Sequence, residues 1–128
     1  MIIPRVPERF GIRYGVLRPL LSVLGLGPRH SGLDLDPGRL RVRMGWAFIA
    51  TVTRSQIRSA ARWDGLVGGI GVHGWGGRWL VNGAASGLVT LEIDPAARAW
   101  VIGMPVKLRS LRVSVEDPDA FLAALGAG

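Results

Sequence analysis

The residues with the greatest potential for chemistry lie in a glycine-rich segment, residues 73–79, which reads HGWGGRW. Aromatic rings can stack on a ligand and an arginine can bind an anion. Glycine lets the backbone approach a ligand closely, because it has no Cβ. We therefore predict a ligand-binding site formed by His73, Trp75, Arg78 and Trp79. The alternative is that the two tryptophans fill the core and the glycines only let the chain bend.

Other chemistries lack the residues that they need. The chain has no cysteine, which excludes disulfides, thiolate metal sites and cysteine nucleophiles. The two histidines, His30 and His73, occur in no His-x-x-His or His-Glu spacing typical of zinc sites. A Ser–His–Asp set could use His73 and Asp64, but no nucleophile-elbow pattern is present. We therefore expect no enzymatic activity, no metal and no cofactor.

Residues 69–74 (GIGVHG) match the G-x-G-x-x-G pattern of dinucleotide-binding proteins. That pattern has meaning when a strand precedes it, a helix follows it and an acid occurs about 20 residues later. Here the next residues, Trp75-Gly76-Gly77, are a poor helix start. We interpret the match as chance in a glycine-rich stretch.

Positive charge is concentrated in the first half of a chain whose net charge is +7. Residues 1–63 hold eleven arginines and three acids, whereas residues 64–128 hold five cations and six acids. A basic half can attract an anionic membrane or nucleic acid. Nucleic-acid modules usually place exposed aromatics among such cations, whereas Trp46, Phe48 and Trp63 fall at positions predicted to face inward, so nucleic acid is disfavoured. The candidate basic surface consists of Arg39, Arg41, Arg43, Arg54, Arg58 and Arg62.

The clearest structural elements are two alternating stretches, residues 33–36 and 39–44, which predict a β-hairpin with its apolar side chains inward. Pro37-Gly38 between them is typical of the central positions of a type II turn. A two-residue turn places the two aspartates of the first strand opposite arginines of the second. This pairing argues against the hairpin as a phosphate-binding ribbon.

The remaining pattern predicts more strands and one C-terminal helix. Residues 12–18 favour a strand ended by Pro19, residues 20–26 an apolar turn or short helix, and residues 53–57 and 95–97 turns. Further strands are predicted at 46–52, 58–63, 78–82, 88–94, 99–103 and 108–115. At the end, Asp117 can cap a helix that begins at Pro118, buries Phe121 and terminates at Gly126.

From Leu33 onward the chain resembles the bacterial PH-like domain family, in particular its uncharacterised actinobacterial members. The resemblance is carried by Leu40-Arg41-Val42, the turn around Ile57, the strand 79–81 and the ending 111–122 (LRVSVEDPDAFL). It implies a mainly β fold, an antiparallel β-barrel of about seven strands capped by a C-terminal α-helix. Residues 1–30 would form an arm with the first strand, and residues 31–128 the barrel and helix of a single domain.

The resemblance implies a non-enzymatic binding module, for which three functions stay open. The leading one is protein interaction or homo-oligomerisation through free strand edges. The second is peripheral binding of anionic lipid through the basic half, with residues 20–26 entering the interface. The third is a small-molecule site under a loop formed by the glycine-rich segment, residues 73–79. Residues 15–27 are too short and interrupted to span a bilayer, so we expect a cytoplasmic protein, or one peripheral at the inner membrane face.

Overall fold

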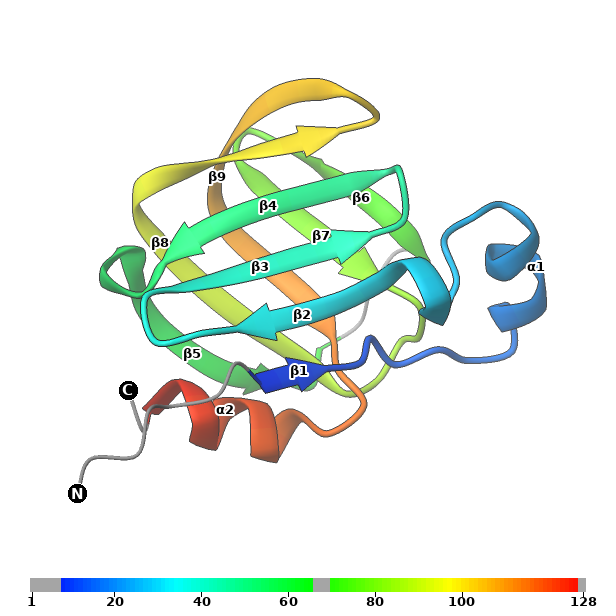
Figure 1. Cartoon of the computed structure of the whole chain (residues 1–128), viewed down its shortest axis with the longest axis horizontal. Helices are drawn as coiled ribbons and strands as arrows, with labels where there is room; N and C mark the ends of the chain where they lie inside the picture. Colours follow the sequence, from blue (N-terminus) through cyan, green and yellow to red (C-terminus); the bar gives the residue numbers. More distant parts are fainter. Residues whose placement is uncertain (1–7, 66–69, 127–128) are drawn as a thin grey trace.

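The computed structural model describes residues 8–65 and 70–126, which form a nine-stranded β-sheet with two α-helices (Figure 1). The helices are α1 (Arg18–Val23) and α2 (Pro118–Gly126), and short 3-10 turns occur at η1 (Pro28–His30) and η2 (Arg54–Gln56). The strands are β1 (Glu8–Phe10), β2 (Ser31–Leu35), β3 (Arg39–Met44), β4 (Phe48–Thr53), β5 (Ile57–Trp63), β6 (Gly71–Trp75), β7 (Arg78–Asn82), β8 (Leu88–Val101) and β9 (Met104–Ser114). The prediction of a mainly β fold is confirmed.

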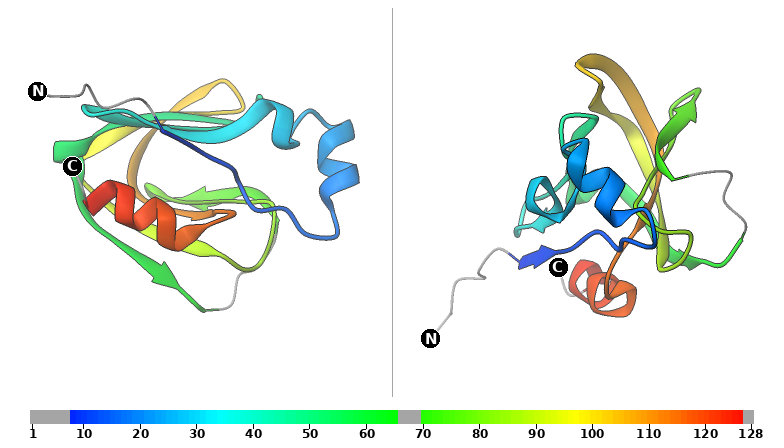
Figure 2. Two further views of the ribbon diagram at one scale, coloured as in Figure 1. Left: turned by 60° about the horizontal axis from the view of Figure 1, so that its bottom comes forward. Right: turned by 90° about the vertical axis from the view of Figure 1, so that its right-hand side faces the viewer.

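The long hairpin β8–β9 bends and joins two layers of the sheet. The strand order is β1-β2-β3-β4-β8-β9-β7-β6, and β5 also pairs with β8. The second half of β8 pairs with β4, its first half pairs with β5, and the register with β9 shifts between Glu92 and Ala97. We call β1–β4 with residues 97–108 the N-terminal layer, and β5, β6 and β7 with residues 88–93 and 110–114 the C-terminal layer. Figure 2 shows the two layers facing each other.

The prediction of a closed antiparallel barrel is wrong. Within the described residues the sheet is open, because its end strands β1 and β6 do not pair with each other. The segment after β1 leaves the sheet and makes two isolated bridges, Ile12 with Val115 and Tyr14 with Gly83. In addition, β7 and β9 pair in parallel, whereas β8, on the other side of β9, pairs with it antiparallel.

Helix α2 covers the open side between the layers (Figure 2). Its Phe121 is fully buried and meets Phe10 of β1 edge-on, with ring centroids 5.3 Å apart. The predicted capping is confirmed, because the Ala120 N–H donates to Asp117 Oδ1 at 3.1 Å. The negative charge of the Asp117 carboxylate at the N-terminus of α2 also interacts favourably with the helix dipole. Capping by Asp117 and burial of the Phe121 ring therefore both hold α2 in place.

The β2–β3 hairpin has the predicted register, with Asp34 opposite Arg41, and its apolar side chains are buried. Its turn is not type II, since Gly38 is not among the glycines with positive φ. Instead, Asp36 Oδ1 accepts the N–H groups of Gly38 (3.0 Å) and Arg39 (2.9 Å). These bonds, the one from Gly38 first, hold the pKa of the Asp36 carboxyl below its ordinary value.

Two predictions about the first half of the chain need correction. The strand expected at residues 12–18 is absent, and α1 begins at Arg18 with Pro19 in its first turn, where proline costs no hydrogen bond. Trp46 lies in the turn before β4 and is 55% exposed, so it does not face inward. The predicted turn at 53–57 is confirmed in outline as η2, followed by β5.

Two further corrections concern the second half. Residues 73–75 were expected in the loop at residues 73–79 but belong to β6, which pairs with β7. Residues 95–97 do not reverse the chain, because β8 continues through them to Val101. β6 forms by pairing with the adjacent strand β7, and β8 continues through residues 95–97 to Ala97, which pairs with Leu108 of β9, so the local glycine and proline signals mislead. Gly69, the first residue of the G-x-G-x-x-G match, lies outside the described residues.

Tyr14 ties the segment after β1 to the segment after α1, because its Oη donates to the Leu26 carbonyl at 2.6 Å. Burial raises the pKa of the phenol, and the neighbouring Ser31 opposes this effect. We expect Tyr14→Phe to lower the free energy of unfolding by about 1–2 kcal/mol. Because the folded-state pKa is raised, the neutral phenol contributes fully below about pH 10, and its contribution is lost as the pH rises further.

Urea unfolding of wild type and Tyr14→Phe, at neutral pH and above pH 10, measures both effects. The difference between the two proteins is expected to shrink at high pH. Equal stability at neutral pH would contradict the role given to the hydroxyl group.

Candidate functional site

The hairpin β6–β7 carries all four predicted ligand residues but divides them between two faces. Gly74 pairs with Trp79, and His73 pairs with Leu80. Because side chains alternate along a strand, His73 and Arg78 share the outer face, whereas Trp79 points to the inner face and packs against the core. The backbone of Trp75 pairs with Arg78, and its side chain lies outside the described part of the structure.

A pocket of about 260 Å³ opens on the outer face of the C-terminal layer. Its lining residues are His73, Gly74, Arg78, Trp79, Leu80, Glu92, Ser110 and Arg112. Trp79 also lines this pocket although its ring points inward, and Gly74 lets β6 lie close to that ring, since a Cβ on Gly74 would be 2.9 Å from Trp79 Cδ2. The structure thus brings three predicted residues together around one pocket.

Sequence reasoning missed the contribution of β8 and β9 to this pocket. In the β9 register Arg112 lies between Thr90 of β8 and Leu80 of β7. Its guanidinium carbon lies 3.6 Å from the centroid of the Trp63 ring, and its Nε donates to Thr90 Oγ1 at 3.1 Å. Burial lowers the pKa of Arg112, Glu92 opposes this effect and Arg78 adds to it. The alternation along β9 was the available signal, because it turns Arg112 outward.

The six arginines of the predicted basic surface do not form one free patch. Arg54 donates to the main-chain carbonyls of Asp36 and Leu125, both at 3.1 Å. Three others form ion pairs: Arg39–Asp36 (3.5 Å), Arg58–Asp94 (3.8 Å) and Arg62–Asp119 (3.2 Å). Within the described residues, Arg41 and Arg43 alone of the six have exposed side chains without a partner.

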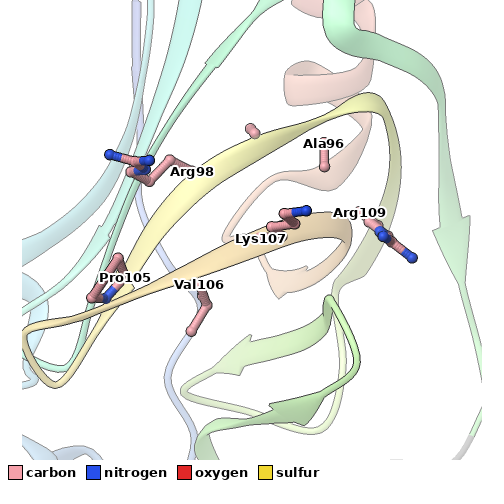
Figure 3. Close-up of a pocket in the computed structure, with 7 residues that line it drawn as sticks. Ala96, Arg98, Pro105, Val106, Lys107 and Arg109 are labelled. Carbon is pink, nitrogen blue, oxygen red and sulfur yellow. The ribbon is translucent and has the colours of Figure 1, made fainter.

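A second group of cations extends this surface on the N-terminal layer. Arg41 pairs with Thr51, Thr51 with Arg98, and Arg98 with Lys107, so their side chains form one row across the outer face. A pocket of about 480 Å³ lies beside this row; Figure 3 shows Lys107 and Arg109 extending to the same side of β9. Its lining residues are Ala96, Ala97, Arg98, Pro105, Val106, Lys107 and Arg109. Comparing the net charges of the two halves of the sequence did not reveal Arg98, Lys107 and Arg109, because acids outnumber cations in residues 64–128.

Exposed large apolar side chains occur at one end of the molecule, among the residues that the structure describes. Three segments supply them: residues 16–24 around α1, the β3–β4 turn and the β8–β9 turn. We call this group the apolar end. Its members are Val16, Leu17, Leu20, Val23, Leu24, Trp46, Trp100, Ile102 and Met104. In Figure 1 these segments lie on the right-hand side.

Hydrogen bonds join the three segments of the apolar end. Trp46 Nε1 donates to the Leu24 carbonyl at 2.7 Å, and the Ile102 N–H donates to the Ala47 carbonyl at 3.0 Å. Gly25 has φ +81° and lies under the indole, because a Cβ there would be 3.3 Å from Trp46 Nε1. The exposed side chains therefore belong to one connected surface.

The β8–β9 turn places an apolar side chain in an unfavourable conformation. Its central residues, Ile102 and Gly103, have φ of +50° and +76°. Turns of this kind favour Asn-Gly, and a non-glycine residue with left-handed backbone costs about 1–2 kcal/mol. Ile102 is 65% exposed, so core packing does not offset this cost.

Comparisons with protein-family models, with curated proteins and with solved structures each found no match. Across residues 8–65 and 70–126, no helix reaches the length and apolar character required to cross a membrane. The same residues contain no group of three or more histidine, aspartate or glutamate side chains that could hold a metal ion.

Proposed function

We propose that this protein binds peripherally to an anionic membrane surface through its apolar end. The observation that carries the proposal is the gathering of exposed large apolar side chains on three connected segments. Val23 is 84% exposed and Ile102 is 65% exposed. Contiguous exposed apolar surface on a water-soluble domain is typical of a binding face, and shallow burial in a lipid interface removes it from water.

The charge around the apolar end favours anionic lipid over a second copy of the chain. Residues 9–33, 37–63 and 95–115 contain no aspartate or glutamate. Their exposed cations without ion pairs in the described part include Arg18, Arg29, Arg43, Arg98 and Lys107. Two copies meeting through this end would bring like charges together, whereas anionic headgroups neutralise them.

The β8–β9 hairpin carries its side chains in the order that a membrane interface favours. At about 3.3 Å per residue, the row of Trp100 and Pro105 lies about 8 Å from the turn, and the row of Arg98 and Lys107 about 15 Å. Apolar side chains favour the hydrocarbon, tryptophan the interface, and cations the phosphate level. Insertion of the turn at Ile102 would satisfy all three preferences.

Kinship with the PH-like family remains part of this proposal. It is supported by a last strand that runs into the Asp117-Pro118 helix start and by a helix that covers the open side of a bent sheet. A protein-interaction module acting through strand edges has less support. The edge strand β1 has three residues, and β5 presents Arg58 and Arg62, features that discourage edge pairing.

Vesicle flotation tests the proposal with phosphatidylcholine alone and with added phosphatidylglycerol. The wild-type protein is expected to float with the anionic vesicles. The double variant Arg98→Gln/Lys107→Gln is expected to lose about 2 kcal/mol of binding free energy, or about 30-fold in affinity, at about 1 kcal/mol per cation.

The matched control is Arg39→Gln/Arg58→Gln, which removes the same charge from cations that are ion-paired with Asp36 and Asp94. It is expected to change affinity much less. Binding that is indifferent to phosphatidylglycerol, or an equal loss in both double variants, would overturn the proposed surface. Self-association through the apolar end without flotation would assign that end to a second copy instead.

A further inference from the structure

We propose that the pocket on the outer face of the C-terminal layer is a binding site for a small phosphate-bearing anion, held between Arg78 and Arg112. This site is distinct from the apolar end and does not depend on membrane binding. The two arginines lie on the adjacent strands β7 and β9, and both line the pocket. Ser110 of β9 pairs with Arg78 and places its hydroxyl side chain on the same face.

Arg112 is positioned before any ligand arrives. Its guanidinium group stacks on Trp63 at 3.6 Å, and its Nε is occupied by Thr90 Oγ1 at 3.1 Å. No hydrogen bond in the described part of the chain uses its two terminal nitrogens. A stacked guanidinium loses little conformational freedom on binding, and its remaining donors match the oxygens of phosphate.

The pocket carries a net positive charge, because two arginines, Arg78 and Arg112, line it together with one carboxylate, that of Glu92, which partly compensates Arg112. Arg78 makes no ion pair within the described residues, and its positive charge repels that of Arg112. Glu92 also lines the pocket but forms no ion pair with either arginine there. A dianion between the two guanidinium groups would offset their repulsion, and partial burial would strengthen the interaction.

The pocket limits the size and character of the ligand. A volume of about 260 Å³ is small for a ligand site and suits a compact metabolite. Trp79 and Leu80 contribute apolar surface, while His73 and Ser110 contribute polar groups. These features favour a short phosphate ester, in which the phosphate contacts the arginines and the organic part contacts Leu80.

Nuclear magnetic resonance titration tests the site with inorganic phosphate and with glycerol 3-phosphate as probes. Saturable shifts are expected at the Arg112 Nε–H and the Trp63 indole. Arg78→Gln and Arg112→Lys, which retains the charge but lacks the planar fork, are each expected to weaken binding about tenfold. The matched control Arg41→Gln, an exposed cation on the other layer, is expected to change it less than about twofold.

Absence of saturable shifts with both probes would overturn the site, as would an equal loss of affinity in Arg41→Gln and Arg78→Gln. Arg78 is exposed, so its variant tests the proposal even if Arg112→Lys fails to fold. Vesicle flotation of Arg78→Gln separates this site from the proposed membrane function, because flotation is expected to stay unchanged. Shifts seen only with vesicles of phosphatidic acid, and with neither soluble probe, would contradict a site for small soluble anions.

Discussion

Ile102→Asn is expected to make the protein more stable and, at the same time, to weaken its binding to anionic vesicles. Ile102 has φ +50° in a two-residue turn, a conformation that asparagine adopts readily and a β-branched residue does not. Relief of this conformation is expected to raise the free energy of unfolding by about 1 kcal/mol. Loss of the apolar side chain removes about 1.5–3 kcal/mol of transfer free energy, or about tenfold to 150-fold in affinity.

Denaturant unfolding and vesicle flotation of the same preparation measure the two opposite effects. Val23→Asn is the matched control, because it removes another exposed apolar side chain of the apolar end from a helical position. It is expected to weaken flotation without raising stability. If Ile102→Asn is stabilised but floats like the wild type, the turn residue has no membrane role, and a loss of stability would contradict the strain assigned to it.

Phe121→Ala is expected to cause the largest loss of stability, about 3–5 kcal/mol. Phe121 is fully buried, meets Phe10 at 5.3 Å and is the main anchor of α2 over the open side of the sheet. A loss of this size can approach the whole stability of a small domain. Phe121→Leu, which keeps most of the volume, therefore serves as a second variant with an expected loss below about 1.5 kcal/mol.

Urea unfolding followed by circular dichroism measures these losses. Leu125→Ala provides the control on the same helix, because Leu125 is half-buried and its truncation is expected to cost less than that of Phe121. A loss below about 1 kcal/mol in Phe121→Ala would show that α2 is not needed to close the core.

Elements defined by neighbouring residues could be predicted from the sequence. The β2–β3 hairpin follows from strict alternation, and α2 follows from Asp117, Pro118 and the apolar residues after them. The open sheet could not be predicted in this way. Its determinants are pairings between distant segments, such as β7 beside β9 and β5 beside the first half of β8. The glycines in β6 and Pro95 in β8 are local signals of a loop or turn, yet β6 pairs with the adjacent β7 and β8 continues through Pro95.

The candidate sites show the same division. The glycine-rich segment was predicted to form a binding site because unusual residues are close together in its sequence. Arg112, however, comes from another strand, and Trp79 faces the core. The basic surface was predicted by counting charges, which cannot reveal the ion pairs of Arg39, Arg58 and Arg62. Trp46 was predicted to face inward because its strand was predicted to begin at residue 46, whereas β4 begins at Phe48.

Spin-label depth measurement on anionic vesicles tests the membrane-binding surface most directly. The chain contains no cysteine, so single cysteines at Ile102, Val23 and Ser55 give uniquely labelled proteins. Ser55 lies in η2, away from the apolar end (Figure 1). Labels at Ile102 and Val23 are expected to become accessible to oxygen and protected from a water-soluble relaxation agent, while the label at Ser55 stays in water. Labels at Ile102 and Val23 that stay as water-exposed as the one at Ser55 would contradict membrane binding through the apolar end.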